Sequence, residues 1–200
     1  MKGLLLKDFY MARSLLVFLG VVFLVLGVSF SYLVSPWAMT VIATVMMGVN
    51  VTSSIQADQT SGWLKTVLTT PVSRKTLLNS KYVLYLLFSL AGLLLGLLVG
   101  AIAALALDAG REMLVLFLWI SVSMALFSGG MLLPLSFCLE EGGSMVGNIL
   151  AYPLSAGLYV GLVLLLGDRP WTCPVIALLA AAVFALSWLV SQKILARKEL

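Results

Sequence analysis

The sequence predicts an all-α, polytopic membrane protein with six transmembrane helices in a single domain, residues 1–200. Two observations carry this prediction. Hydrophobic residues make up 62% of the chain, with a mean hydropathy of +1.14, and only 10% of the residues are charged, against roughly 25% in soluble domains. About 20 apolar residues cross the hydrocarbon core of a bilayer. The charges leave five uncharged runs, which provide length for six crossings: 14–57, 82–107, 113–139, 142–167 and 170–192.

The first of these runs is long enough for two spans, and the other four hold one span each. We place the break in the first run at Ser35-Pro36, because proline ends a helix and the residue before it leaves the α region. A β-barrel would need strands of alternating apolar and polar residues, and the stretch 15–26 shows no such alternation. The predicted spans are 15–33, 37–55, 82–107, 113–138, 146–167 and 171–192.

An even number of spans puts both termini on one side of the membrane. Ten of the twelve Lys and Arg residues fall on that side, and two, Arg111 and Arg169, fall opposite. Cytoplasmic loops carry the excess of Lys and Arg, so the sequence predicts that both termini are cytoplasmic. The net charge of +4 is thus an orientation signal, and we expect no nucleic-acid partner.

The opening segment, residues 1–14, mixes apolar residues with charged ones. This pattern predicts a short helix lying in the membrane interface before the first span. A simple basic flank that fixes the topology fits equally well. A secretory signal peptide fits poorly, since a full-length span follows the charged start and further spans follow that one.

The connection between the second and third spans, residues 56–81, is the one sizeable soluble element, because the outward connections are short. Its apolar residues recur at helical spacing and predict one apolar stripe on a helix of about two turns. These residues are Trp63, Leu64, Val67 and Leu68.

Polar residues and proline suggest where helices of this loop start and stop. Asp58, Thr60 or Ser61 can cap the short helix, and Pro71 ends it. Ser73 can cap a second helix that continues into the third span. The loop helix either lies on the membrane, with basic residues on lipid headgroups, or forms a docking surface for a soluble partner.

Three short motifs follow one another through this loop: Asp58-x-x-Ser61-Gly62-Trp63, then Leu68-x-x-Pro71-Val72-Ser73-Arg74-Lys75, then Ser80-Lys81-Tyr82. The chain begins Met1-Lys2-Gly3-Leu4-Leu5-Leu6-Lys7-Asp8. With the length and the six-span layout, these motifs resemble the small permeases of type-2 ATP-binding-cassette (ABC) exporters. That family includes exporters of phenol-soluble modulins and of peptide antibiotics, and it commonly has Asp-Glu where this chain has Asp58-Gln59.

The resemblance implies a multi-pass permease of a bacterial plasma membrane that forms a homodimer among the lipids. Such a permease moves amphipathic peptides and binds no cofactor itself, because ATP and Mg are held by separate cytoplasmic ATPase subunits. The loop 56–81 would be the coupling helix that fits into a groove on each ATPase. The residues expected at that contact are Asp58, Trp63, Leu64, Val67, Leu68, Pro71, Arg74 and Lys75.

No catalytic and no metal site is predicted. The chain has no histidine, which excludes His-ligated zinc and a Ser-His-Asp triad. It also has no Gly-x-x-x-x-Gly-Lys-Ser/Thr phosphate loop, so it does not hydrolyse ATP by that route. None of the five runs contains an ionisable residue, which argues against an ion-coupled transporter. We therefore expect the energy to come from another polypeptide.

Glu140 and Glu141 form the only acidic pair on an otherwise basic side. One hypothesis is that they attract a cationic part of a substrate at the inner entrance. A solvated turn that ends the fourth span is the alternative.

Glycines repeat at four-residue spacing in two spans, as Gly92, Gly96 and Gly100 in the third and as Gly157 and Gly161 in the fifth. Small residues at this spacing let a second helix approach closely. They indicate either helix packing within the chain or a dimer interface.

Two functions remain open at this point. The first is the permease subunit of an ABC exporter for amphipathic or antimicrobial peptides. The second is a non-transporting membrane scaffold or immunity protein that binds a peptide in the bilayer. Only the first predicts an ATPase subunit that co-purifies with the chain.

Overall fold

The computed structural model describes residues 2–63, 73–107, 113–138, 141–167 and 169–197. Within these ranges the chain forms six long α-helices and no strand, which confirms the predicted all-α class. In chain order the helices are α1 (Lys2–Leu33), α2 (Ala38–Thr60), α4 (Arg74–Ala106), α5 (Leu114–Cys138), α6 (Glu141–Leu166) and α7 (Thr172–Arg197).

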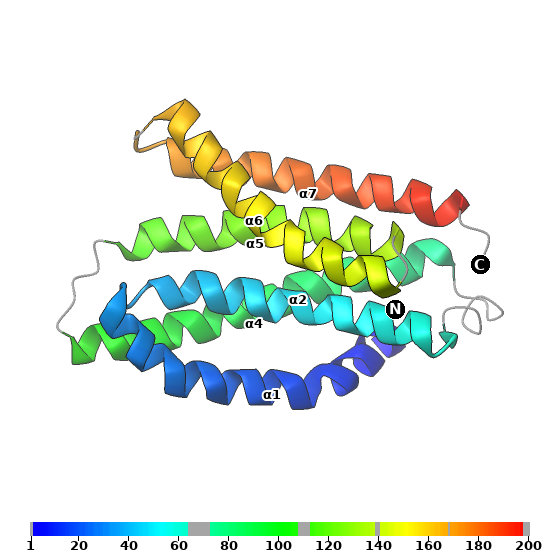
Figure 1. The fold of residues 1–200 in the computed structure, drawn as a ribbon, viewed down its shortest axis with the longest axis horizontal. Coiled ribbons are helices and arrows are strands. Elements are labelled where there is room, and N and C mark those ends of the chain that lie inside the picture. The colour runs from blue at the N-terminus through cyan, green and yellow to red at the C-terminus, as the bar shows by residue number, and fades with distance from the viewer. Residues whose placement is uncertain (1, 64–72, 108–112, 139–140, 168, 198–200) are drawn as a thin grey trace.

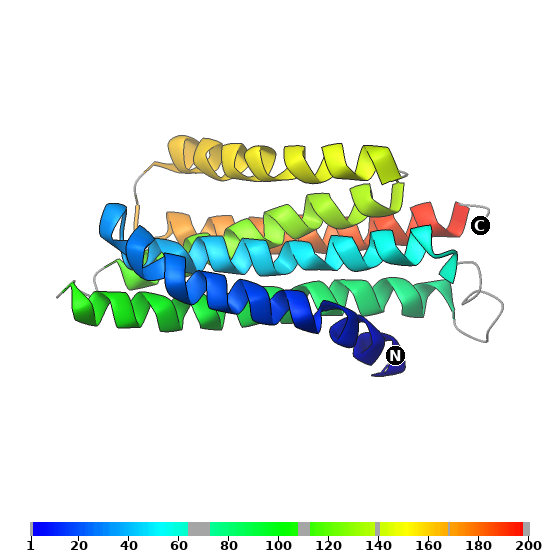
Figure 2. The same ribbon diagram turned by 60° about the horizontal axis from the view of Figure 1, so that its bottom comes forward.

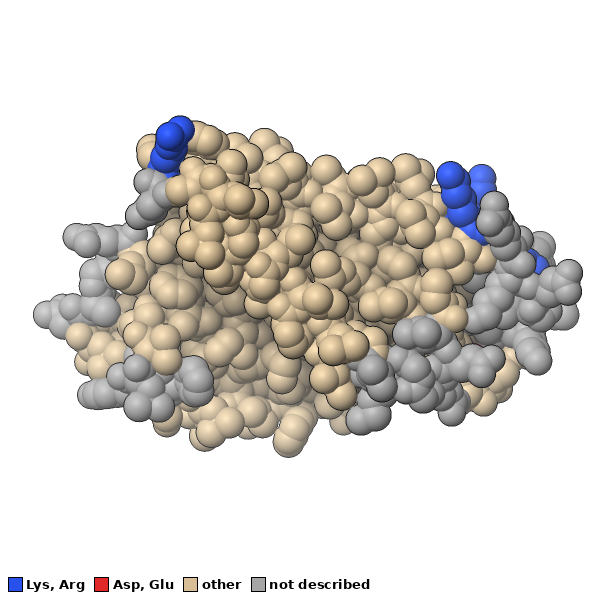
Figure 3. Space-filling view, turned by 45° about the horizontal axis from the view of Figure 1, so that its top comes forward, with Lys and Arg blue, Asp and Glu red and all other residues tan. Residues whose placement is uncertain are grey.

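Each of these helices contains a stretch that is long and apolar enough to cross a membrane. The outer surface carries many exposed large apolar side chains, such as Leu105, Leu164 and Leu165. In Figure 3, Lys and Arg side chains lie at the two ends of the visible face, and the surface between them is neither basic nor acidic. An apolar belt between charged ends is what a bilayer requires of a helical protein.

Several helices reach further into the charged flanks than predicted. α1 runs without interruption from Lys2, so the segment 1–14 is its first part, and Figure 2 shows this start angled away from the rest of α1. α2 extends to Thr60, beyond its predicted span, whereas α4 begins at Arg74, directly after the predicted Ser73 cap, so both ends of the loop 56–81 are helical. The break between α1 and α2 falls around Pro36, where the sequence predicts it.

The predicted cap at Ser73 is confirmed, because its Oγ accepts the backbone N–H of Thr76 at 3.1 Å. The three candidate caps earlier in the loop make other bonds. The hydroxyls of Thr60 and Ser61 donate to the backbone carbonyl of Ala57. The carboxylate of Asp58 forms ion pairs with the side chains of Lys7 and Lys81.

α2 and α5 occupy the middle of the bundle (Figure 1). α4 and α1 pack on the side of α2, while α7 and α6 pack on α5, and α6 crosses α5 obliquely. Figures 1 and 2 both show α1 beginning, α2 ending, α4 beginning and α7 ending at one end of the bundle. We call this the terminal end.

The glycines of α4 lie directly against the backbone of α2. A Cβ atom added to Gly92 would lie 2.3 Å from the carbonyl oxygen of Ala43, and one added to Gly96 would lie 2.6 Å from the Cα of Thr40. One added to Gly100 would lie 2.9 Å from the carbonyl oxygen of Pro36. Any side chain would therefore force the two helices apart.

The glycines of α6 have a different environment. Within the described part of the chain, no atom beyond the local helix lies within 4 Å of a Cβ added to Gly157 or Gly161. The two glycine motifs have the same spacing, but only the one in α4 is used for packing between these helices.

Tyr85 of α4 connects this pair to α5. Its ring lies between Gly48 of α2 and Gly129 of α5, and a Cβ added to Gly129 would come within 2.3 Å of the ring. Its hydroxyl donates to the carbonyl of Ala125 at 2.7 Å. One turn nearer the terminal end, the Tyr82 hydroxyl bonds serine hydroxyls of α7. α4 thus holds neighbours on both sides of the bundle.

Candidate functional site

Four charged side chains meet at the terminal end, and we call them the ion cluster: Lys7 and Asp8 of α1, Asp58 of α2 and Lys81 of α4. Asp8, Asp58 and Lys81 are only 1–2% exposed, whereas the side chain of Lys7 is 28% exposed. Charged residues are almost never this buried unless they are paired. The cluster is therefore the most unusual polar feature among the described residues.

Lys81 is the centre of the cluster. Its Nζ donates to Oδ2 of Asp8 at 2.8 Å, to Oδ2 of Asp58 at 2.7 Å and to Oγ of Ser54 at 3.1 Å. All three protons of the ammonium group are thereby used. One side chain of α4 thus bonds α1 and α2 at the same time.

Lys7 closes the cluster on its outer side. Its Nζ donates to Oδ1 of Asp58 and lies 3.5 Å from Oδ1 of Asp8. The same ammonium group sits 3.3 Å from the centroid of the Trp63 ring, which is the geometry of a cation–π contact. Trp63 and Leu4 of α1 both pack on Leu77 of α4. Trp63, three residues after the end of α2, is therefore in contact with α1 through Lys7.

The local structure explains why these groups meet. Ser54 and Asp58 are four residues apart on α2, so they share one helix face. Lys81 lies two turns into α4, whose start is fixed by the Ser73 cap. Apolar residues on the adjoining turns form a buried core: Ala12, Val51, Ile55 and Leu78. In such surroundings an unpaired charge is very costly, and the two lysines and two aspartates of the cluster sum to zero charge.

Two hydrogen bonds connect α5 and α7 to the same end. Nε2 of Gln59 donates to the backbone carbonyl of Ser136, near the end of α5, at 3.0 Å. An ionised glutamate has no proton to donate, so the glutamine has a distinct role at this position. Nε1 of Trp188 on α7 donates to Oδ1 of Asn79 on α4 at 2.8 Å. The terminal end of the bundle is thus cross-linked by side chains of α1, α2, α4 and α7 and by a backbone carbonyl of α5.

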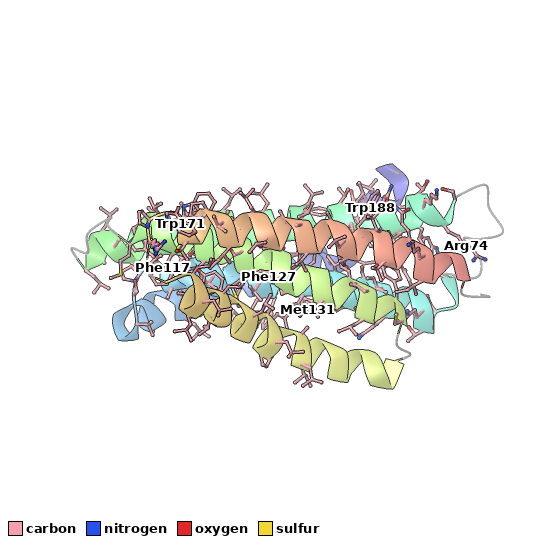
Figure 4. The ribbon with its side chains drawn as sticks, turned by 90° about the horizontal axis from the view of Figure 1, so that it is seen from above. Arg74, Phe117, Phe127, Met131, Trp171 and Trp188 are labelled. Carbon is pink, nitrogen blue, oxygen red and sulfur yellow. The ribbon has the colours of Figure 1, made fainter. Side chains whose placement is uncertain are left out.

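The structure places part of the predicted ATPase contact near the ion cluster. Asp58 belongs to the cluster and is buried, and Trp63 is half-buried and packs on Leu77. Arg74 is the first residue of α4 and is seen at the terminal end in Figure 4, with Lys75 exposed beside it. Four of the predicted contact residues lie outside the described residues: Leu64, Val67, Leu68 and Pro71.

The two predicted acidic residues are only partly described. Glu140 lies outside the described residues, and Glu141 is the first residue of α6, with a side chain that is also outside them.

The sequence analysis assigned no site role to Lys7, Asp8, Ser54 or Lys81, although three of them lie in the segments that carry the family resemblance. A signal was present, because Asp8 and Asp58 are the only acidic residues among the first 107. Lys81 directly precedes the apolar run 82–107. What sequence spacing does not show is that residues 51 to 73 positions apart meet in space.

A groove separates α1 from α4 just beyond the ion cluster. It encloses a cavity of about 440 Å³ and is open to the outside, since Leu6, Phe9 and Leu87 are exposed. Its lining is entirely apolar: Leu5, Leu6, Phe9 and Leu16 of α1 with Leu84, Leu87, Phe88 and Ala91 of α4.

The chain forms a bundle of helices long enough to span a membrane. At the cross-linked terminal end, residues 56–81 connect two of these helices, α2 and α4. Comparison with the curated proteins and with the solved structures finds no match. A family model described as ABC-2 family transporter protein matches residues 3–196, nearly the whole chain. The chain therefore belongs to the ABC-2 family of transporter proteins, as a multi-pass permease subunit that works with a partner ATP-binding subunit and is not itself the ATPase.

Proposed function

We propose that this permease exports amphipathic or antimicrobial peptides across a bacterial plasma membrane, with both termini in the cytoplasm. ATP and Mg are bound by the separate ATPase subunit. The orientation is supported by the distribution of basic residues. Ten Lys and Arg residues fall on the side of the membrane that holds the termini, and two fall on the opposite side, as is typical when the termini are cytoplasmic.

The connection 56–81 is the docking element for the ATPase in this proposal. The observation that carries it is the ion cluster, which surrounds the start of this connection and bonds it to three helices. A docking element transmits force only if its base is fixed to the parts that must move. Trp63, Arg74 and Lys75 are the described residues that we assign to the ATPase contact, with Leu64, Val67, Leu68 and Pro71 between them.

The peptide cargo is supported by the chemistry of the chain's surfaces. The groove between α1 and α4 has only apolar lining residues, which suits the apolar face of an amphipathic peptide. Glu140 and Glu141 come shortly after the α5 residues in the sequence and supply negative charge for a cationic peptide in this proposal. A homodimer doubles the number of spans around the cargo. Within the described chain, Gly157 and Gly161 of α6 face no neighbouring helix, so a helix of a second copy could pack closely against them.

Co-purification tests the ATPase contact. The permease and its partner ATPase are expressed together and purified through a tag on the permease. We expect a stoichiometric ATPase that is lost from the variant carrying Trp63→Ala and Leu68→Asp. The matched control is Trp171→Ala, which removes an exposed tryptophan at the opposite end of the bundle (Figure 4) and is expected to retain the ATPase. Intact binding by the double variant would contradict the docking site.

Peptide-stimulated ATPase activity tests the cargo. The complex is reconstituted in lipid vesicles and titrated with amphipathic helical peptides of cationic, neutral or anionic charge. We expect stimulation by the amphipathic peptides, strongest for the cationic ones, and a smaller preference for cationic peptides after Glu140→Gln with Glu141→Gln. Stimulation that is equal for scrambled, non-amphipathic peptides would contradict the proposed substrate class.

A further inference from the structure

α1 differs from α2 and α4 in how it is connected to the docking element. α2 and α4 continue into the connection 56–81 through the backbone, so they follow its movement directly. α1 lies far away in the sequence, with Lys7 and Asp58 separated by 51 positions. Among the described residues, its ion pairs with other helices are those of Lys7 and Asp8.

We propose that the ion cluster is a joint through which movement of the docking element reaches α1. This inference rests on the proposed function of the connection 56–81 as the ATPase contact. Lys7, Asp8 and Lys81 are then positioning residues, which couple α1 to the ATPase without touching ATP or cargo.

The joint has a fixed part and a movable part. Lys81, Asp8, Asp58 and Ser54 are at least nine-tenths buried and hold one another by hydrogen bonds of 2.7–3.1 Å. Lys7 is at the edge, partly exposed, and its ammonium group contacts the ring of Trp63. A shift of Trp63 on docking therefore acts first on Lys7, and through it on both carboxylates.

The cluster also holds a second acceptor for Lys7. Oδ1 of Asp8 is buried and makes no hydrogen bond within the described part of the chain. It lies 3.5 Å from Nζ of Lys7, which is bonded to Oδ1 of Asp58. A small displacement moves the ammonium group from one carboxylate toward the other, so the cluster can change geometry while every charge stays paired.

The space around α1 fits such a movement. The apolar groove lies beside the cluster, between α1 and α4. α1 also packs in the buried core with α2 and α4 through Ala12, and further along Phe23 packs on Met39 and Val99. A tilt of the first half of α1 about these contacts widens or narrows the groove.

Stability alone gives no reason for four charges at this place. Replacing a buried ion pair by apolar side chains of similar size is often neutral or stabilising, whereas removing one partner is strongly destabilising. A variant that removes both partners of one pair can therefore restore folding. If transport is still impaired in such a variant, the pair has a coupling role and not only a structural one. The variant that carries both Asp8→Asn and Lys81→Met keeps the Lys7–Asp58 pair and leaves the cluster neutral, but it removes the bond between α1 and α4.

The experiment measures two quantities in the reconstituted complex of permease and ATPase: the yield of folded complex, and the peptide transported per ATP hydrolysed. Asp8→Asn and Lys81→Met alone each leave one unpaired buried charge, so we expect a low yield of folded permease. We expect the double variant to recover the yield and to bind the ATPase, while its transport per ATP falls about tenfold. Lys193→Met, at an exposed position of α7, is the matched control and is expected to behave as wild type.

A double variant that folds, binds the ATPase and keeps the wild-type ratio of transport to hydrolysis would overturn the proposal. Lys7→Gln is a second test. Because the Lys7 side chain is 28% exposed at the edge of the cluster, we expect a smaller loss of folded permease than for Lys81→Met, and transport per ATP is measured on the folded fraction. We expect its transport per ATP to fall, and a wild-type ratio here would also overturn the joint. Failure of the wild-type permease to bind any ATPase would instead refute the proposed function, so the two failures are distinguishable.

Discussion

α4 and α1 both pack beside α2, but by different chemistry. α4 meets α2 backbone to backbone, because Gly92, Gly96 and Gly100 leave no space for a side chain. α1 meets the same two helices through the ion cluster at its start, through Ala12 in the buried core and through Phe23 further along, and a groove lies between α1 and α4 beside the cluster.

The difference indicates which parts of the bundle move together. Close-packed interiors are rigid, and they are disturbed by a change in side-chain volume of even one methylene group. We therefore expect α2 and α4 to move as one body. A contact made of long lysine side chains, next to an apolar groove, tolerates displacement. The comparison therefore identifies α1 as the helix that can move against a rigid pair.

The largest effect is expected at the centre of the ion cluster. Lys81→Met leaves two buried carboxylates with one lysine, and removing one partner of a buried ion pair costs about 3–5 kcal/mol. Thermal unfolding of the purified permease measures the loss. Addition of Asp8→Asn is expected to restore most of the stability, and a double variant as unstable as Lys81→Met would show that charge pairing does not govern this site.

A smaller loss is expected from the α2–α4 contact. Gly92→Ala places a methyl group where an added Cβ lies 2.3 Å from a backbone oxygen of α2, and overpacking of this kind costs about 1–3 kcal/mol. The free energy of unfolding in a mixed-detergent titration measures it. Transport per ATP in the folded fraction is expected to stay unchanged, because α1 is not involved, and a fall in that ratio would argue against the rigid pair.

Trp63→Leu is expected to have a moderate effect on α1. Leucine retains the apolar contact with Leu77 but removes the ring beneath the Lys7 ammonium group, a contact of about 0.5–2 kcal/mol. We expect Lys7 to become more reactive toward an amine-directed reagent, as measured by mass spectrometry of the labelled peptide. The reactivity of exposed Lys193 is the internal reference, and equal labelling of Lys7 before and after the change would contradict the contact.

The smallest effect is expected at α6. Gly157→Ala has the same chemistry as Gly92→Ala, but its Cβ meets open space within the described chain. Its effect on unfolding is expected to stay within about 0.5 kcal/mol, as for other surface changes. A loss of unfolding free energy as large as that of Gly92→Ala would contradict this, because it would mean that the glycines of α6 pack as closely against a neighbouring helix as those of α4.

Periodicity and charge placement sufficed to predict the helical class, the six long apolar segments and the break at Pro36, because these depend on local sequence. The two glycine motifs show where that reasoning stops, since identical spacing in α4 and α6 leads to different environments. The ion cluster depends on contacts between α1, α2 and α4 that no local pattern encodes. Asp58, predicted as a possible helix cap, lies inside α2, and both Asp58 and Lys81 are buried because each charge has its partner on another helix.

The central claim, that α1 follows the docking element through the ion cluster, is tested most directly by a distance across the groove. Spin labels are placed at Tyr10→Cys on α1 and Leu86→Cys on α4, both exposed, after Cys138 and Cys173 are replaced by serine. Labelled permease is diluted into an excess of unlabelled chain and assembled with the ATPase. Pulsed electron spin resonance then gives the distance with and without trapped ATP.

With the intact cluster, we expect a narrow distance distribution in each nucleotide state. With Asp8→Asn and Lys81→Met, we expect the distribution to broaden, most strongly when ATP is trapped, because α1 no longer follows the rigid pair. A distribution that remains equally narrow in both states of that variant would contradict the account.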